Sequence, residues 1–217
     1  MEAGKVFVEL EKQILDLTLR PGTELNLNNL ASLFGVSRSP IRDAIRELSS
    51  QHLVDIYPQR GTYVSKINLK RADDERFIRL NLELGAIEKF MDKKTQEDID
   101  AMKALLDEQA KAFALRDTAV LLKLDDEFHK VIFKAAGREE VFNFIQSNNG
   151  NYHRMRVISF MFDNIADDVL EQHSALISAI EKDDKESLKE LDRKHISKLL
   201  YETDSFRESM PQYFVES

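Results

Sequence analysis

The stretch GVSRSPIRDAIREL, residues 35–48, decides how the N-terminal part of this chain folds. Four of its apolar residues follow the i, i+3, i+4, i+7 spacing of a buried helix face: Ile41, Ala44, Ile45 and Leu48. At 100° per residue, Ser39, Arg42 and Arg46 gather on the opposite side. The pattern therefore predicts an amphipathic helix whose exposed side is basic.

The residues before this helix predict a second, shorter one and a tight turn. Ser37 is a suitable N-cap, and Pro40 falls in the first helical turn, where its missing N–H is not needed. The earlier helix has a shorter apolar stripe, formed by Leu27, Leu30, Ala31 and Phe34. It stops at Gly35, which can adopt a left-handed turn conformation. Two short helices joined in this way are typical of a helix-turn-helix that enters the major groove of DNA.

A hairpin is expected directly after the second helix. Residues 53–57 alternate as a strand, residues 58–61 form a turn, and residues 62–64 return. Arg60 and Gly61 lie at the tip of this wing, where glycine lets the backbone approach a phosphate or a minor-groove edge. Exposed arginines on a helix or in a turn can be merely solvated. The combination of two helices, a glycine turn and a wing favours DNA binding, in which Arg46 would take part together with Arg42 on the exposed side of the helix.

Composition excludes several classes of protein. The chain has 217 residues and no cysteine, so it has no disulfide, no thiolate metal site and no cysteine nucleophile. No run approaches the roughly 20 apolar residues of a membrane span, and the first thirty residues lack a signal-peptide pattern. We therefore expect a cytoplasmic protein with no membrane partner.

The net charge of −8 is unevenly distributed. Residues 1–68 hold eight basic and eight acidic side chains, so the whole negative excess lies in residues 69–217. Residues 35–66 carry a charge of +2. Phosphate neutralisation supplies most non-specific affinity for DNA, so a single copy of this small basic face would bind weakly. This favours a homodimer.

The sequence predicts a mainly α protein in two domains. A winged helix-turn-helix occupies residues 1–66, a polar linker residues 67–74, and an all-helical antiparallel bundle residues 75–217, which serves effector binding and dimerisation. Helices are expected over residues 73–92, 95–115, 117–136, 138–147, 151–162, 167–182 and 185–203. The last dozen residues are expected to form a loose tail.

Four polar side chains stand where core residues are expected in this bundle. Asp125 and His129 are four residues apart and face one way from a single helix. His173 and His195 lie on the apolar stripes of two later helices. Burying such groups without partners is costly, so we expect them to satisfy one another. Three imidazoles and a carboxylate suit a divalent metal such as Zn, Ni, Mn or Fe, and a metal-free hydrogen-bonded cluster is the alternative.

The chain resembles a known family at these positions. Residues 1–65 are similar to the winged-helix domain of GntR-type bacterial transcription regulators, through Arg20-Pro21-Gly22, the motif at residues 35–45 and the Arg60-Gly61 tip. The later part is similar to the FCD effector domain of the FadR subgroup. The matching pieces are Arg79-Leu80-Asn81-Leu82-Glu83, Asp125-Asp126-Glu127-Phe128-His129, Glu171-Gln172-His173 and His195.

The resemblance implies roles for individual residues. Arg38, Ser39, Arg42, Arg60 and Gly61 would contact operator DNA, which a dimer would read as a palindrome. Some members have an arginine early in the helix before the turn, where this chain has Asn28.

For the bundle, the resemblance implies a metal held by the Asp–His cluster and a small organic acid as effector. Arg79 would line the effector site or only pair with Glu83. His153 would be a further metal ligand, complement the carboxylate of the effector, or belong to a surface cluster with Arg154 and Arg156. The expected function is a ligand-responsive repressor. A metal-dependent enzyme with an incidental helix-turn-helix, or an architectural DNA binder with a structural polar core, are the alternatives.

Overall fold

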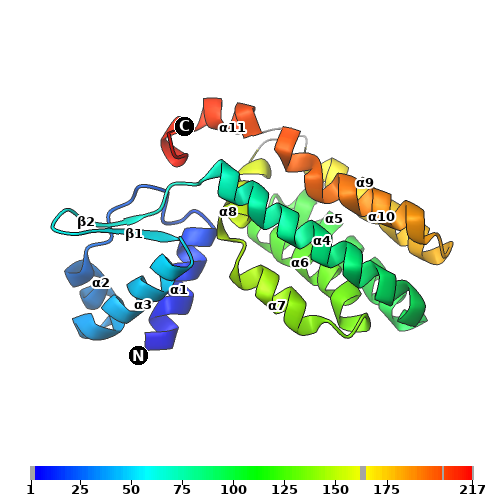
Figure 1. Cartoon of the computed structure of the whole chain (residues 1–217), viewed down its shortest axis with the longest axis horizontal. Helices are drawn as coiled ribbons and strands as arrows, with labels where there is room; N and C mark the ends of the chain where they lie inside the picture. The colour runs from blue at the N-terminus through cyan, green and yellow to red at the C-terminus, as the bar shows by residue number, and fades with distance from the viewer. Residues whose placement is uncertain (1–2, 162–164, 202, 217) are drawn as a thin grey trace.

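A computed structural model describes residues 3–161, 165–201 and 203–216 of the chain. It shows a small N-terminal domain beside a larger helical bundle (Figure 1). The N-terminal domain consists of α1 (Ala3–Leu15), α2 (Leu27–Phe34), α3 (Arg38–Ser50), β1 (Val54–Tyr57) and β2 (Gly61–Val64). This order confirms the predicted winged helix-turn-helix.

The turn between α2 and α3 is built as the sequence indicates. The side chain of Asn26 caps α2 by accepting hydrogen bonds from the backbone N–H groups of Asn28 and Asn29. Gly35 ends α2 with φ 63° and ψ 36°, the left-handed conformation that glycine adopts without steric cost. Ser37 takes the N-cap position of α3, but among the described residues its side chain makes no capping hydrogen bond.

The apolar stripes of α1 and α3 form the core of this domain. The predicted residues of α3 are all buried, and they pack with Val6, Leu10 and Ile14 of α1. The two strands pair antiparallel, with Val54 opposite Val64 and Tyr57 opposite Gly61. The exposed side of α3 and the wing are thereby left on the surface of the domain.

The second domain is a bundle of antiparallel helices, as predicted. Its helices are α4 (Leu69–Lys93), α5 (Gln96–Ala114), α6 (Thr118–Ala135), α7 (Glu139–Ser147), α8 (Gly150–Ser159), α9 (Ile165–Glu181) and α10 (Lys185–Ser197), followed by η1 (Lys198–Tyr201). Residues 162 and 202, which fall in predicted helices, lie outside the described residues. None of the described helices is both long and apolar enough to cross a membrane.

The segment predicted as a linker is mostly helical. α4 begins at Leu69, where the side chain of Asn68 accepts a hydrogen bond from the backbone N–H of Arg71. Polar residues suggested a linker, but they lie on the outer face of an amphipathic helix whose buried residues include Ala72 and Glu75. Residues 69–74 therefore extend the bundle to within a few residues of the wing.

The predicted loose tail is also wrong. Its described residues, 206–216, form the end of α11 (Thr203–Ser209) and η2 (Pro211–Tyr213), and the side chains of Phe206 and Phe214 are each only 1% exposed. The backbone of Ile67 donates to Tyr213 O at 2.8 Å and accepts from Val215 N at 3.0 Å. The chain end is thus fixed against the segment that joins the two domains.

Helix α8 connects the bundle to the N-terminal domain. Its first residue, Gly150, lies so close to Leu53 that a Cβ atom there would be 2.7 Å from the leucine side chain. Arg154, which is fully buried, donates to the backbone oxygen of Ser65 at 2.6 Å. The side chain of Asn151 accepts from the backbone N–H of Asn68 at 3.0 Å. Both domains are therefore in contact through α8.

Candidate metal centre and DNA-binding surface

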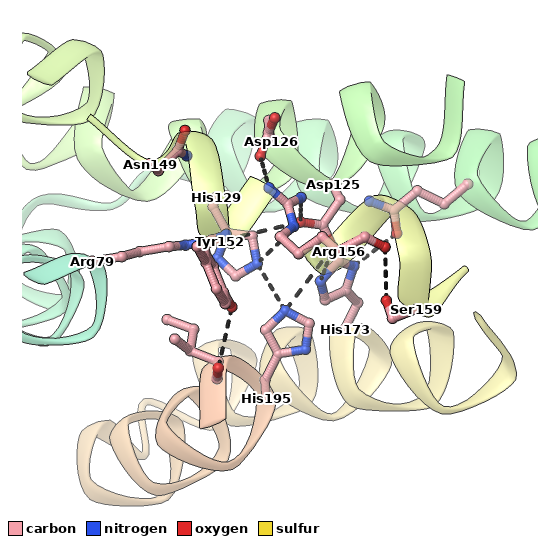
Figure 2. Close-up of polar contacts among 12 residues, drawn as sticks. Arg79, Asp125, Asp126, His129, Asn149, Tyr152, Arg156, Ser159, His173 and His195 are labelled. Carbon is pink, nitrogen blue, oxygen red and sulfur yellow. Dashed lines mark hydrogen bonds and ion pairs between the residues drawn. The ribbon is translucent and has the colours of Figure 1, made fainter. Parts of the chain in front are cut away.

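The four polar side chains predicted to form a cluster do converge in the bundle (Figure 2). Asp125 and His129 come from α6, His173 from α9 and His195 from α10. One donor atom from each lies within 4.8 Å of those of the other three. His173 Nε2 is 3.4 Å from Asp125 Oδ1, and the Nε2 atoms of His129 and His195 are 3.1 Å apart.

Each imidazole is oriented by a side-chain oxygen behind it. The three pairs are His129 Nδ1 with Glu83 Oε1, His173 Nδ1 with Gln109 Oε1 at 2.7 Å, and His195 Nδ1 with Gln172 Oε1 at 2.7 Å. A carboxylate or amide oxygen can only accept, so each Nδ1 carries the proton. All three Nε2 atoms then present lone pairs to the centre of the cluster.

These lone pairs fit a bound cation. The Nε2 atoms of His129 and His195 face each other at 3.1 Å, where two lone pairs repel, and His173 Nε2 has no hydrogen-bond partner among the described residues. A separation of 3.1 Å suits two nitrogen ligands of one first-row metal, each about 2.1 Å from the ion. The donor set therefore fits a divalent metal better than a metal-free hydrogen-bonded cluster.

The electrostatics of the cluster favour the protonation states that bind a metal. Burial lowers the pKa of His173 to about 3 and lowers the pKa of His195 well below its ordinary value. Burial alone would raise the pKa of Asp125, but Arg156 and the three imidazoles outweigh burial and hold it well below its usual range. At neutral pH the site therefore offers neutral imidazoles at His173 and His195 and an ionised carboxylate at Asp125.

Two further buried carboxyl groups lie behind His129. Glu83 accepts from His129 and lies 3.4 Å from Arg79 Nε, and these two partners overcome burial and lower its pKa. Neither side-chain oxygen of Asp192 has a hydrogen-bond partner in the described part of the chain. Burial, reinforced by the charge of Glu83, raises the pKa of Asp192 well above its ordinary value. Of the two carboxyl groups, Asp192 is thus suited to be protonated and Glu83 to be ionised.

A small cavity of about 40 Å³ opens onto the cluster. Asp125 and His195 form part of its wall, and three basic side chains also line it: Arg79, Arg156 and Lys198. Arg156 donates to Asp125 at 2.6 Å and to Asp126 at 2.8 Å. Among the described atoms, Arg79 Nη2 has no hydrogen-bond partner. It lies 4.0 Å from Asp125 Oδ2, too far for a hydrogen bond. Positive charge and a donor without a hydrogen bond make this cavity suitable for a small anion.

The two residues predicted for the effector site, Arg79 and His153, differ in their position relative to the cavity. Arg79 lines the cavity and also pairs with Glu83. His153 is half-buried and does not line the cavity. The predicted surface cluster around it is wrong, because Arg154 and Arg156 are buried and Arg156 faces the cavity.

The predicted DNA-contacting residues share one surface of the N-terminal domain. Arg38, Arg42 and Gly61 line a hollow of about 280 Å³ between the start of α3 and the wing. Asn26 and Asn28 from the start of α2 also line it. The hollow therefore combines two arginines, a helix N-terminus and a glycine, which are groups that contact DNA phosphates and base edges.

The other three predicted residues are exposed around this hollow. Ser39 lies in the first turn of α3, and Arg46 lies further along, 3.9 Å from Asp43. Arg60 lies over the ring of Tyr57 at 5.8 Å. All three side chains are accessible for contacts with DNA.

Sequence reasoning missed the residues that orient the imidazoles. Gln109 continues the buried stripe of Ile99 and Met102, and a glutamine on such a stripe is a signal that could have been noticed. Gln172 precedes His173 but faces His195, which only the packing of α9 against α10 reveals. Asn28 was seen only as a departure from a family pattern, whereas it lines the hollow between α3 and the wing.

Comparison with known proteins is consistent with both halves of this structure. Residues 2–64 match the family of bacterial regulatory proteins named gntR, and residues 76–198 match the FCD domain. The chain is 29% identical over 184 residues to the HTH-type transcriptional regulator YdhC of Bacillus subtilis, which covers 84% of this chain and 82% of YdhC. It is 26% identical over 212 residues to the HTH-type transcriptional repressor RspR of Escherichia coli. This match covers 98% of this chain and 93% of RspR.

Solved structures share the same fold. McbR/YncC of Escherichia coli superposes with a TM-score of 0.75 at 21% identity and covers 93% of this chain and 98% of its own. A GntR regulator from Rhodococcus superposes with a TM-score of 0.73 at 19% identity. The superposition covers 97% of this chain and 98% of the Rhodococcus chain. The matched families and relatives are regulators, not enzymes. This chain therefore belongs to the gntR family of bacterial regulatory proteins, carries an FCD domain and is a transcriptional regulator.

Proposed function

We propose that this regulator is a homodimeric repressor that releases palindromic operator DNA, or changes its affinity for it, when a small carboxylate binds beside a divalent metal. The observation that carries the proposal is the convergence of three Nε2 lone pairs and Asp125 on one point next to a cavity lined by arginines. The relative RspR is named a repressor, which supports the direction of control.

Asp125, His129, His173 and His195 would hold the metal. When bound, such an ion supplies positive charge and coordination positions beyond four that can accept a carboxylate oxygen. The chain itself supplies the rest of the anion site, because Arg79 offers an Nη2 donor that makes no hydrogen bond to a described residue and Arg156 adds a second guanidinium. The cavity of about 40 Å³ favours a compact organic acid over a long-chain one.

The N-terminal domain would read the operator. Arg38, Arg42 and Ser39 project from the first turns of α3, the part of a recognition helix that reaches base edges in the major groove. Arg60 and Gly61 would contact the neighbouring backbone or minor groove through the wing. Because its proposed target is DNA, we expect the regulator to act in the cytoplasm.

Helix α8 provides a direct route between the two sites. Tyr152, Arg156 and Ser159 line the cavity from this helix. The same helix holds the N-terminal domain through Gly150 and Arg154. A ligand that changes the position of Arg156 therefore acts on a helix that already contacts the DNA-binding domain. Such a ligand shifts the regulator between DNA-competent and DNA-incompetent arrangements by its difference in affinity for them.

The test combines metal analysis with DNA binding. Purified protein is analysed for Zn, Ni, Mn and Fe, and its affinity for the DNA upstream of its own gene is measured by fluorescence anisotropy with and without a panel of small carboxylates. We expect about one metal per chain, salt-dependent DNA binding and a shift of affinity with at least one acid. His173→Ala should lose the metal while keeping its helix content. DNA binding without metal or ligand response would instead indicate an architectural DNA binder with a structural polar core.

A further inference from the structure

The outer face of α4 carries a symmetric pattern. Seven exposed residues recur at steps of three or four and occupy about 80° of the helix surface: Arg71, Asp74, Ile78, Leu82, Gly85, Lys89 and Asp92. The helix packs against α10 and α7 on its flanks and against α6 and α8 beneath (Figure 1). This outer stripe is left uncovered by the described residues.

The centre of the stripe is apolar and has space for a neighbour. The side chains of Ile78 and Leu82 are 41% and 36% exposed, and Phe77 beside them is 60% exposed. A Cβ atom built at Gly85 meets no described atom within 4 Å. A glycine between large apolar residues allows another helix to approach closely.

We propose that this stripe is the dimer contact, in which α4 of one copy crosses α4 of a second copy in antiparallel orientation. This inference deepens the proposed function and rests on its homodimer. A two-fold axis that passes between residues 81 and 82 pairs each residue with a residue of the other copy. The numbers of the two paired residues add up to 163. Ile78 then faces Gly85 of the other copy, and Leu82 faces Asn81.

The charges select this orientation. In the antiparallel pair Arg71 faces Asp92, and Asp74 faces Lys89, so all four outer contacts join opposite charges. A parallel pair in register would place each of these residues against its own copy, which juxtaposes like charges. Asp74 and Asp92 also contact Lys70 and Lys185 at 2.9 and 3.4 Å within the chain, and such exposed pairs are weak enough to rearrange.

The position of α4 gives this contact a regulatory consequence. The buried side of the same helix carries Arg79, which lines the cavity, and Glu83, which orients His129. Its first residue follows the wing by only a few residues. The angle at which two α4 helices cross would therefore set the distance between two DNA-binding domains, and the effector site lies directly behind the crossing.

Disulfide cross-linking tests the register, because the chain has no cysteine of its own. Within one chain, residues 78 and 85 lie about 10 Å apart along the helix, too far for a disulfide. We expect the double variant Ile78→Cys/Gly85→Cys to form covalent dimers on mild oxidation. Ile78→Cys alone and Gly85→Cys alone should not, whereas an equimolar mixture of the two should. Cross-linking of Ile78→Cys alone at the rate of the double variant would overturn the antiparallel pairing.

Charge reversal provides a second measurement that does not depend on oxidation. Asp74→Lys and Lys89→Asp should each raise the dimer dissociation constant about tenfold, measured by sedimentation, because each places two like-charged contacts in the dimer. The combination Asp74→Lys/Lys89→Asp should restore it. No change in either single variant, or no rescue in the double, would overturn the proposal.

The same samples separate this inference from the proposed function. Leu82→Glu should be monomeric, bind metal as the wild type does and lose most of its affinity for a palindrome while keeping that for a half-site. A dimeric Leu82→Glu protein with normal palindrome binding overturns the α4 contact and leaves the proposed function standing. A wild-type protein without metal or palindrome binding would overturn the proposed function irrespective of the cross-links.

Discussion

Replacing Gln109 should weaken metal binding although Gln109 is not a metal ligand. Its side chain is fully buried, and its oxygen accepts from His173 Nδ1 at 2.7 Å. The ring of His173 stacks on Phe128 with a centroid distance of 4.1 Å and an interplanar angle of 5°. Packing therefore fixes the ring plane, and Gln109 fixes the tautomer. Gln109→Leu keeps the approximate volume and removes the acceptor oxygen together with the amide nitrogen, which has no hydrogen-bond partner among the described residues.

The magnitude follows from the two tautomers of His173. Without Gln109, the Nδ1–H group is left buried and unpaired, which costs about 1–3 kcal/mol. The other tautomer carries its proton on Nε2, which is 3.4 Å from Asp125 Oδ1 and can donate to it. That tautomer cannot coordinate a metal through Nε2. We expect a loss of about 10- to 100-fold in metal affinity, which corresponds to about 1.4–2.8 kcal/mol.

Gln109→Glu is the matched variant with the opposite expectation. A carboxylate would accept from His173 Nδ1 more strongly than an amide does, as Glu83 already does for His129. The affinity for Zn²⁺ should then equal or exceed that of the wild type. Affinities are measured by competition with a chelator in a calorimeter, and circular dichroism verifies that each variant is folded. A folded Gln109→Leu protein with wild-type affinity would refute the idea that Gln109 sets the tautomer.

Two further predictions concern DNA binding and the chain end. Arg42→Ala should cost about 1–3 kcal/mol of specific operator affinity if Arg42 contacts a base edge, and an unchanged affinity and footprint would remove Arg42 from the DNA contacts. Phe214→Ala should lower the free energy of unfolding in urea by about 3–5 kcal/mol, because this ring is 1% exposed. Val215→Ala is the control for Phe214→Ala, because residue 215 is 46% exposed. It should change the free energy of unfolding by less than about 0.5 kcal/mol. An equally small change in Phe214→Ala would mean that packing of the tail does not stabilise the fold.

Local patterns were sufficient for most of the fold. The stripe of α3 and the turn at Gly35 depend on spacing and on one permissive residue, so both could be predicted. The start of α4 could not, because its first turns are polar and become helical through the Asn68 cap and the contacts of Glu75 with α8. The position of Phe214 depends on Ile67, which is far away in the sequence.

The candidate site could be predicted in part for the same reason. Histidines on apolar helix stripes are visible in the sequence, and their convergence was expected because unpaired polar groups are costly to bury. Arg156 was misjudged because adjacent arginines usually mark an exposed face, whereas α8 is buried on nearly all sides. The partners of the imidazoles come from α4, α5 and α9, and only tertiary packing brings these helices to them.

The arrangement of donors indicates how an acidic effector would act. Arg156 donates one N–H to Asp125 and one to Asp126, whereas Arg79 Nη2 has no hydrogen-bond partner among the described residues and lies 4.0 Å from Asp125 Oδ2. A carboxylate that binds both guanidinium groups would gain one bond to α4 through Arg79 and one to α8 through an N–H of Arg156 that the two aspartates leave unused. Since interactions can shift a conformational equilibrium only through their difference between states, such a ligand would act by favouring one relative position of α4 and α8. The N-terminal end of α8 contacts the DNA-binding domain, so a shift of α8 would reach that domain directly.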